Sequence, residues 1–320
     1  MPARRRDVVT NPWTAAVLCV AVALSVGGPP TPDRPPLYVP DSRNHRIVRV
    51  DTTGAWYALG RSGRGLGEFA HPQSVAVDRQ GRLYVADAAN HRIVRVRDIS
   101  GARWTSLGRF GDGPRRFAFP TAVAVDALGR IYVADQGNHR IVRTDDITGG
   151  GWMSLPRQGE GGYRFAFPSG VALDRRGRIY VADSHHHRIV RMDELSGVGW
   201  QVFGGPGDGV GMFFFPAAVA VDGSDRIYVA DRGNHRIVRM DDMRGAGWVA
   251  FGRRGNGRGE FLFPSGVEVD ASGRITVIDT WNHRVVRLDD MTGAGWTTLG
   301  VGGGRSVRFR YPRDLVTYAP

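Results

Sequence analysis

The strongest constraint on the fold of this chain is a sequence unit that occurs six times. Its core reads IYVADRGNHRIVRM from Ile227, and close copies begin at Leu37, Leu83, Ile131, Ile179 and Ile275. Tryptophans fall at a spacing of 48 residues, at Trp56, Trp104, Trp152, Trp200, Trp248 and Trp296. A fixed period of this length indicates a repeat architecture, in which each unit completes its core against its neighbours.

Each unit contains four short segments with strand character. Around Pro216 they are 219–222, 226–230, 235–240 and 248–251, with turn residues between them. Four strands per unit and six units predict an all-β fold, a six-bladed β-propeller of four-stranded blades over residues 37–320. Outside the N-terminal apolar run no segment has helical periodicity, which excludes helical solenoids.

The two ends of the repeat region predict how the ring closes. The first copy begins at Leu37 with a second strand, whereas the C-terminal YPRDLVTYAP has the pattern of a proline followed by a first strand. We therefore expect Asp314–Tyr318 to supply the inner strand of the blade that contains Leu37–Gly60. Closure of this kind leaves no open sheet edge.

The repeated residues resemble those of a known family. The pattern Asp-x-x-Asn-His-Arg-Ile/Val together with Phe-x-x-Pro-x-x-Val-x-Val-Asp is similar to the NHL repeat, in six copies over residues 37–320. The resemblance implies a propeller but no single function, because NHL propellers include protein-binding, RNA-binding and lyase members.

Residues that recur in every copy are expected to build the scaffold. One histidine per blade should open each third strand, too far from its equivalents to share a metal: His45, His91, His139, His187, His235 and His283. The repeat Asp and Asn suit a turn in which they bond local backbone amides. We expect the repeat arginines to pair with aspartates, and the tryptophans to pack between blades from the outermost strands.

The N-terminus predicts export. Arg4, Arg5 and Arg6 precede the apolar run TAAVLCVAVALSV, which is shorter than the roughly 20 residues of a membrane span. We interpret residues 1–28 as a signal peptide or N-terminal anchor and residues 29–36 as a Pro-rich linker. The protein should be periplasmic or extracellular, and only an uncleaved N-terminal segment would attach it to a membrane. Cys19 is the single cysteine, so no intramolecular disulfide forms.

The charge balance suggests an anionic partner. The formal net charge is +12, and all positive side chains other than histidine are arginines, which suit carboxylate and phosphate. Topology should place the Gly-rich loops between blades on one face with the turns between second and third strands. The arginines of these loops are candidate ligand contacts, although such loops also serve as plain connectors: Arg61, Arg64, Arg109, Arg115, Arg116, Arg253, Arg254 and Arg258.

Single departures from the repeat are the other candidates. His71 replaces an aromatic residue before a blade proline, His185 and His186 extend a turn to three histidines, and Trp281 replaces a small turn residue. Glu268 replaces an inner-strand alanine, and Arg313 follows Pro312. We expect Glu268 and Arg313 to lie near the axis on adjacent blades, where they could pair.

Two functions remain open. The first is a monomeric, non-enzymatic binding scaffold whose basic loop face contacts a protein or a polyanion, either nucleic acid or anionic glycan. The alternative is a metal-dependent propeller lyase or hydrolase with its site at the mouth of the central channel.

Propeller lyases that resemble this fold carry histidines directly after the blade prolines. The equivalent residues here are Gln73, Thr121, Ser169, Ala217, Ser265 and Arg313. We therefore expect no catalytic residues, no metal ligands and no cofactor, while a calcium ion or an adventitious metal in the channel stays open.

Overall fold

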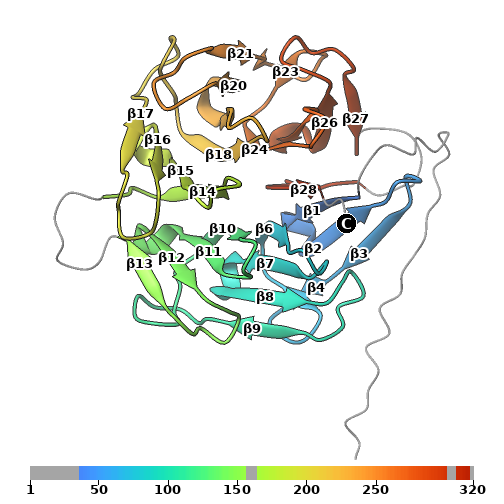
Figure 1. The fold of residues 1–320 in the computed structure, drawn as a ribbon. Coiled ribbons are helices and arrows are strands. Elements are labelled where there is room, and N and C mark those ends of the chain that lie inside the picture. Colours follow the sequence, from blue (N-terminus) through green and yellow to red (C-terminus); the bar gives the residue numbers. More distant parts are fainter. Residues whose placement is uncertain (1–35, 156–163, 301–307, 318–320) are drawn as a thin grey trace, which may run out of the picture.

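The computed structural model describes residues 36–155, 164–300 and 308–317, and within them six four-stranded antiparallel sheets surround a central axis (Figure 1). The inner strands are β6 (Pro72–Val77), β10 (Pro120–Val125), β14 (Pro168–Leu173), β18 (Pro216–Val221), β24 (Pro264–Val269) and β28 (Val316–Thr317). The second strands are β1 (Leu37–Asp41), β7 (Leu83–Asp87), β11 (Ile131–Asp135), β15 (Ile179–Asp183), β19 (Ile227–Asp231) and β25 (Ile275–Asp279).

The third and outer strands complete each blade. The third strands are β2 (Arg46–Val50), β8 (Arg92–Val96), β12 (Arg140–Thr144), β16 (Arg188–Met192), β20 (Arg236–Met240) and β26 (Arg284–Leu288). The outer strands are β3 (Trp56–Leu59), β9 (Thr105–Leu107), β13 (Met153–Leu155), β17 (Gln201–Phe203), β21 (Val249–Phe251) and β27 (Thr297–Leu299). The predicted six-bladed all-β propeller is confirmed. We number the blades 1 to 6 from the sheet β28-β1-β2-β3 to the sheet β24-β25-β26-β27.

Short elements within and between the blades lie on one face. A 3-10 turn joins each second strand to the third: η1 (Ser42–Asn44), η2 (Ala88–Asn90), η3 (Gln136–Asn138), η4 (Ser184–His186), η5 (Arg232–Asn234) and η6 (Thr280–Asn282). Two loops between blades contain small parallel ladders, β4 (Arg61–Ser62) with β5 (Glu68–Phe69) and β22 (Arg253–Arg254) with β23 (Glu260–Phe261). The Asn90 amide donates to the Gly63 carbonyl at 2.8 Å, so loop and turn share a face as expected.

The core lies between neighbouring blades rather than inside one sheet. Every residue of the second strands is buried, because these strands are covered by a blade on each side. One cluster, for example, joins Tyr84 and Ile93 of blade 2 to Val133 and Val142 of blade 3. This burial on both faces explains why the second strands read as nearly continuous apolar runs instead of alternating ones.

The tryptophans join this packing as predicted, although mostly from just outside the strands. Only Trp56 lies within an outer strand, whereas β9, β13, β17, β21 and β27 begin one residue after their tryptophan. Each indole packs against a phenylalanine of a loop between blades; the ring centroids of Phe69 and Trp104, for example, are 5.0 Å apart. The indole therefore fixes the loop against the outer edge of the blade.

The ring closes between the two ends of the described chain. In blade 1, Leu37 pairs with Thr317 and Tyr38 with Val316, and the Arg310 amide donates to the Asp41 carboxylate at 2.6 Å. Closure by the C-terminal segment is confirmed.

The closing strand has a shorter ladder than expected, since β28 contains only two residues against six in the other inner strands. In the other blades the residue opposite the position of Asp314 is Ala86, Ala134, Ala182, Ala230 or Ile278; in blade 1 it is Pro40. The Pro40 carbonyl accepts a hydrogen bond from the Arg313 amide at 3.2 Å, so this side of residue 40 faces the closing strand. Proline has no N–H to donate there, which interrupts the ladder.

The predicted signal peptide or anchor and nearly all of the linker lie outside the described residues, as do parts of the loops at 156–163 and 301–307. No helix in the described part of the chain is long and apolar enough to cross a membrane.

Removal of residues 311–320 should destabilise the whole ring, because blade 1 would lose its inner strand and expose an edge. A point variant tests the same contact: Leu315 is 3% exposed in the closing cluster, so Leu315→Ala should lower the free energy of unfolding by about 2–4 kcal/mol. Thermal and urea unfolding would measure both. A single cooperative transition unchanged from the full chain would contradict the closure.

Candidate functional site

The repeated turn is organised by a buried aspartate. In blade 5, Asp231 is 0% exposed; one carboxylate oxygen accepts the Phe214 amide at 2.8 Å, and the other accepts Asn234 and the Arg236 Nε at 2.8 Å each. Arg236 also donates to the Asp208 carbonyl at 2.6 Å. The expected pairing of repeat Asp and Arg is confirmed, but the aspartate holds the incoming loop rather than local turn amides as we expected. Breaking such a pair typically costs about 3–5 kcal/mol.

The six histidines tie consecutive blades together. The Nδ1 of His235 accepts the backbone N–H of Phe263 at 3.0 Å, and the other five make the same bond to His71, Phe119, Phe167, Phe215 and Tyr311. The expectation that histidine opens the third strand is wrong. Each histidine lies before that strand in the left-handed region, His235 at φ +57°, because the chain must reverse sharply after the 3-10 turn.

A second strained position lies on the other side of this bond. The residues before the blade prolines all have φ between +49° and +51°, which is rare for bulky side chains. Each of their rings packs edge-on against the histidine that accepts their N–H; the centroids of His139 and Phe167 are 4.3 Å apart. We call this set the aromatic rim: His71, Phe119, Phe167, Phe215, Phe263 and Tyr311.

Residues of the 3-10 turns fill gaps in the aromatic rim. His185 lies between Phe167 and Phe215, with centroids 4.4 and 5.2 Å away. Trp281 lies between Phe263 and Tyr311 at 5.2 and 5.8 Å, and the Arg43 guanidinium is 4.1 Å from the Tyr311 ring centroid. Phe119 and Trp281 are 50% and 46% exposed.

The remaining predicted histidines do not form a metal site. His71 packs on His45 with ring centroids 4.7 Å apart, and His186 takes the role of the repeat asparagine, its Nδ1 lying 2.8 Å from Asp183. The described residues contain no group of three or more His, Cys, Asp or Glu side chains that could hold a metal ion.

The loop arginines do not act as one set. Arg61 and Arg253 pair with Glu68 and Glu260 at 3.0 Å within their own loops. Arg115 and Arg258 reach to carbonyls in the turns between third and fourth strands, Gly149 and Gly293, both at 3.4 Å. The Arg116 stem packs beside Gly111. The last three candidates are Arg64, Arg109 and Arg254. Their side chains are exposed and form no ion pair in the described chain.

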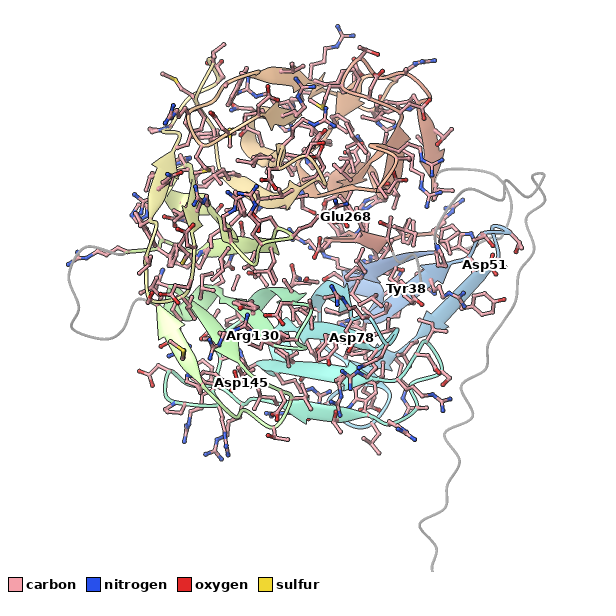
Figure 2. The ribbon with its side chains drawn as sticks, in the orientation of Figure 1. Tyr38, Asp51, Asp78, Arg130, Asp145 and Glu268 are labelled. Atoms are coloured by element: carbon pink, nitrogen blue, oxygen red, sulfur yellow. The ribbon has the colours of Figure 1, made fainter. Side chains whose placement is uncertain are left out.

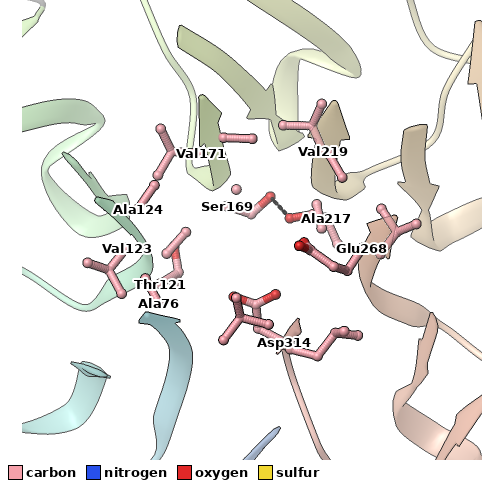
Figure 3. A pocket seen from close by; sticks show the side chains of 18 of the residues that line it. Ala76, Thr121, Val123, Ala124, Ser169, Val171, Ala217, Val219, Glu268 and Asp314 are labelled. Atoms are coloured by element: carbon pink, nitrogen blue, oxygen red, sulfur yellow. Dashed lines mark hydrogen bonds between the residues drawn. The ribbon is translucent and has the colours of Figure 1, made fainter. Parts of the chain in front are cut away.

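The inner strands enclose a central channel with a cavity of about 440 Å³. Its walls are mostly Val, Ala and Leu side chains, and the polar groups of the inner strands occur at few places (Figure 3). Figure 2 shows Glu268 at the centre of the ring, whereas Asp145 lies near its outer edge. The residues that follow the blade prolines line one end of this cavity, together with Gln136 and Arg232 of the 3-10 turns.

Glu268 and Arg313 both line the channel as expected, but they do not form the ion pair that their predicted positions allowed. Glu268 is the fourth residue after its blade proline and Arg313 the first after Pro312, so they lie near opposite ends of the inner strands. The charged neighbours of the Glu268 carboxyl are Asp314 and Asp270. Those of Arg313 are Arg232 and Arg43, and its buried Nε has no hydrogen-bond partner in the described structure.

This environment shifts the pKa of each channel group. Burial, followed by the charges of Asp314 and Asp270, raises the pKa of Glu268 to about 8. Burial raises the pKa of Asp314 to about 6, although the Ser74 hydroxyl donates to its carboxylate. Burial and the neighbouring arginines lower the pKa of Arg313 to about 10. Near neutral pH the channel therefore holds an arginine cluster at one end and two carboxyl groups that share roughly one negative charge.

Sequence reasoning missed Asp314, although its repeat position made it visible. The residues two places after the other blade prolines are Ser74, Ala122, Gly170, Ala218 and Gly266. Their side chains are uncharged, so an aspartate here is a departure as clear as Glu268. The aromatic rim was visible in the repeat too, but nothing in the sequence indicated that its rings would surround the channel mouth.

Solved structures with a similar arrangement share the fold. A propeller in a crystal structure of a nidogen/laminin complex aligns with a TM-score of 0.67 at 16% identity, covering 88% of this chain and 97% of the other. A streptogramin B lyase aligns at 0.51 with 17% identity over 71% of this chain and 68% of its own. A virginiamycin B lyase from Staphylococcus aureus aligns at 0.53 with 14% identity over 76% and 73%. No curated protein matched the sequence.

Fold and turn geometry define a six-bladed β-propeller whose blades are linked by one histidine each. The NHL repeat model matches five segments, residues 69–95, 117–143, 165–192, 213–240 and 261–288. The chain belongs to the NHL repeat family. Blade 1, whose strands come from both ends of the described chain, has the same turn, histidine and Asp–Arg pair as the five matched copies.

Glu268→Ala should stabilise the propeller more at pH 8 than at pH 5. The raised pKa means that the folded state keeps a proton that the unfolded state loses between about pH 4.5 and 8, so stability falls as the pH rises through that window. Alanine stands at this position in four other blades, so the variant should pack normally. We expect a gain of about 1–3 kcal/mol at pH 8, measured by urea unfolding. A gain independent of pH would contradict the burial of the carboxyl.

The linking histidines should make the fold sensitive to acid. Burial lowers the pKa values of His91, His187, His235 and His283, so their stabilisation is complete above about pH 6.5 and is lost as the pH falls through the folded values. His235→Gln should cost about 1 kcal/mol at pH 7.5 and reduce the slope of unfolding free energy against pH between 5 and 6.5. The same slope in variant and wild type would show that another group controls the acid response.

Proposed function

We propose that this propeller is a protein-binding scaffold that captures an acidic segment of a partner on the face that carries the aromatic rim. The observation that supports this most directly is the distribution of exposed apolar side chains. Of the eleven large ones in the described residues, eight lie in the loops between blades, in the aromatic rim or in the 3-10 turns: Leu66, Phe110, Phe119, Phe167, Val210, Met212, Phe214 and Trp281. Exposed apolar patches of this kind typically mark interaction sites.

Three of these side chains, Trp281, Phe214 and Phe110, are larger than the residues at the same repeat position in other blades. The residues equivalent to Trp281 in other blades include Ala89, Gly137 and Gly233. Those equivalent to Phe214 include alanines such as Ala118, and the residue equivalent to Phe110 in blade 1 is Ser62. The backbone has the same form in these copies, so the large rings are not required by the fold. They are 46%, 42% and 64% exposed, respectively.

The positions of these three rings favour a partner of protein size. Phe110 packs on His91 of blade 2, Phe214 on His187 of blade 4, and Trp281 belongs to blade 6. They therefore lie on alternate blades around the channel mouth. A ligand that contacts all three must cover the face, as a protein interface of about 800 Å² on each partner would.

The charged residues between these rings favour an acidic partner. Arg64, Arg109 and Arg254 are exposed, and none of them forms an ion pair in the described chain. Arginine and aromatic residues are enriched at the energetic centres of protein interfaces. A propeller of similar fold occurs in a complex of nidogen with laminin, which is consistent with a binding role. We place this function outside the cytoplasm, on the strength of the N-terminal sequence.

Photo-crosslinking tests the binding face. A photoreactive residue at position 66, where Leu66 is 65% exposed on the rim face, should form adducts with a protein in cell-envelope extracts. One at Leu128, which is 78% exposed in a turn between first and second strands, should not. Mapping of the crosslinked peptide should locate it in an acidic segment.

Repeat-matched variants provide the quantitative test. Trp281→Gly, Phe214→Ala and Phe110→Ser each copy a residue found at the same position in another blade, so folding should be preserved. Each should weaken binding of the identified partner at least tenfold, about 1.4 kcal/mol, in a titration. Two results would contradict a protein partner and indicate a polyanion instead. One is adducts that nuclease destroys; the other is binding that falls steeply with salt and is unchanged in all three variants.

A further inference from the structure

The channel contains charged groups of both signs that the protein leaves unpartnered. The Arg313 Nε is buried without a hydrogen-bond acceptor in the described structure. The charged groups that act on the Glu268 carboxyl, Asp314 and Asp270, are themselves carboxyl groups. Buried polar groups are satisfied in the great majority of cases, so exceptions call for an explanation. An adjacent Glu268 could accept from the Arg313 Nε, but the two residues lie at different levels of the same cavity.

At one end of the cavity the unpartnered charge is positive. Arg313 and Arg232 both line the cavity, and Arg43 is close enough to Arg313 to affect its charge state. Burial also lowers the pKa of Arg232, whose guanidinium lies 5.9 Å from the Phe263 ring centroid. Arg232 and Arg43 repel Arg313, and no carboxylate among the described residues offsets this repulsion at Arg313. A planar anion such as a carboxylate would relieve the repulsion and accept the arginine donors.

Deeper in the channel the charge is negative. The Glu268 and Asp314 side chains extend into the cavity from adjacent blades (Figure 3). The Ser74 hydroxyl orients Asp314 by donating to its carboxylate, and Ser74 is itself fixed because its oxygen accepts the Val123 amide at 3.1 Å. Carboxyl oxygens therefore face the cavity from blade 6 through Glu268 and from blade 1 through Asp314. An ammonium group, with three donors, matches such a pair.

The spacing of the two charged ends limits the ligand. Glu268 occupies the repeat position of Val316, three residues further along the inner strand than Arg313. With a rise of about 3.3 Å per residue, the two levels are about 10 Å apart. An extended chain covers at most ~3.3–3.6 Å per residue, so a tripeptide has this reach.

We propose that the channel binds a small zwitterion whose carboxylate contacts Arg313 and Arg232 and whose ammonium group, about 10 Å away, contacts Glu268, with the Asp314 carboxyl facing the ligand from the level between them. A free tripeptide and an ω-amino acid of equal length share this chemistry. The site is independent of the protein partner proposed for the rim face, since it uses different side chains. Between the two charged levels the lining is mostly Val and Ala, so the charged termini of such a ligand determine recognition.

Isothermal titration of the full chain at pH 7 tests the proposal, with tri-alanine and 8-aminooctanoate as probes. We expect both to bind, and the tighter of the two identifies the source of the ligand. Arg313→Gln copies Gln73 and Glu268→Ala copies Ala76, so both variants should fold, and each should weaken binding at least tenfold. Arg244→Thr, which copies Thr292 in an exposed turn outside the channel and outside the rim face, should leave the affinity unchanged.

Blocked probes test the two ends without any change to the protein. N-acetyl-tri-alanine and tri-alanine amide should each lose most of the affinity. Binding of the ammonium should also displace the proton held by Glu268, so titrations in buffers of different ionisation enthalpy should show proton release in the wild type and less in Glu268→Ala. The proposal is overturned if neither probe binds at millimolar concentration, or if either blocked peptide binds as well as the free one. Binding of butylamine or acetate alone at the affinity of tri-alanine would equally overturn it.

Discussion

The hydrogen bond from each blade to the Nδ1 of one histidine is the contact on which the ring depends. It joins a residue in the left-handed region to a second residue in the left-handed region, so two unfavourable backbone conformations stabilise each other. Six identical bonds, one per junction, give every pair of blades the same relative position. The buried Asp–Arg pair supports this bond by holding the incoming loop close to the turn. Because the histidine must accept, the arrangement requires the neutral ring.

Periodicity in the sequence was sufficient to predict the architecture. A spacing of 48 residues and four strand-like segments predict the blade, and the unmatched segments at the two ends predict the closure. The role of His235 was harder to predict, because a left-handed residue and a strand residue look alike in a run such as NHRIVRM. The interruption opposite Asp314 depended on Pro40, whose effect is visible only once the register of β1 is known.

The misplaced pair of Glu268 and Arg313 shows where such reasoning fails. Both residues were correctly assigned to the axis, but proximity to the axis does not fix the level along it. Counting from the blade proline, one residue for Arg313 and four for Glu268, separates them by half an inner strand. The same count identifies Asp314 as the charged residue between those two levels. In a repeat protein, the position of a residue within the repeat therefore gives its level along the channel directly from the sequence.

The same position within the repeat separates scaffold from function in this propeller. Positions that are identical or nearly so in all six blades, such as Asp231, His235 and Arg236, form hydrogen bonds that hold the turn and the neighbouring loop in place. Positions that vary lie in the channel wall, in the turns and in the loops, where the backbone tolerates alanine, glycine or serine. A charged or large aromatic side chain at such a position adds nothing that the fold requires, and in the case of Glu268 it destabilises the folded state. The presence of Glu268, Asp314 and Arg313 around one cavity, and of Phe110, Phe214 and Trp281 around its mouth, therefore points to ligands rather than to stability.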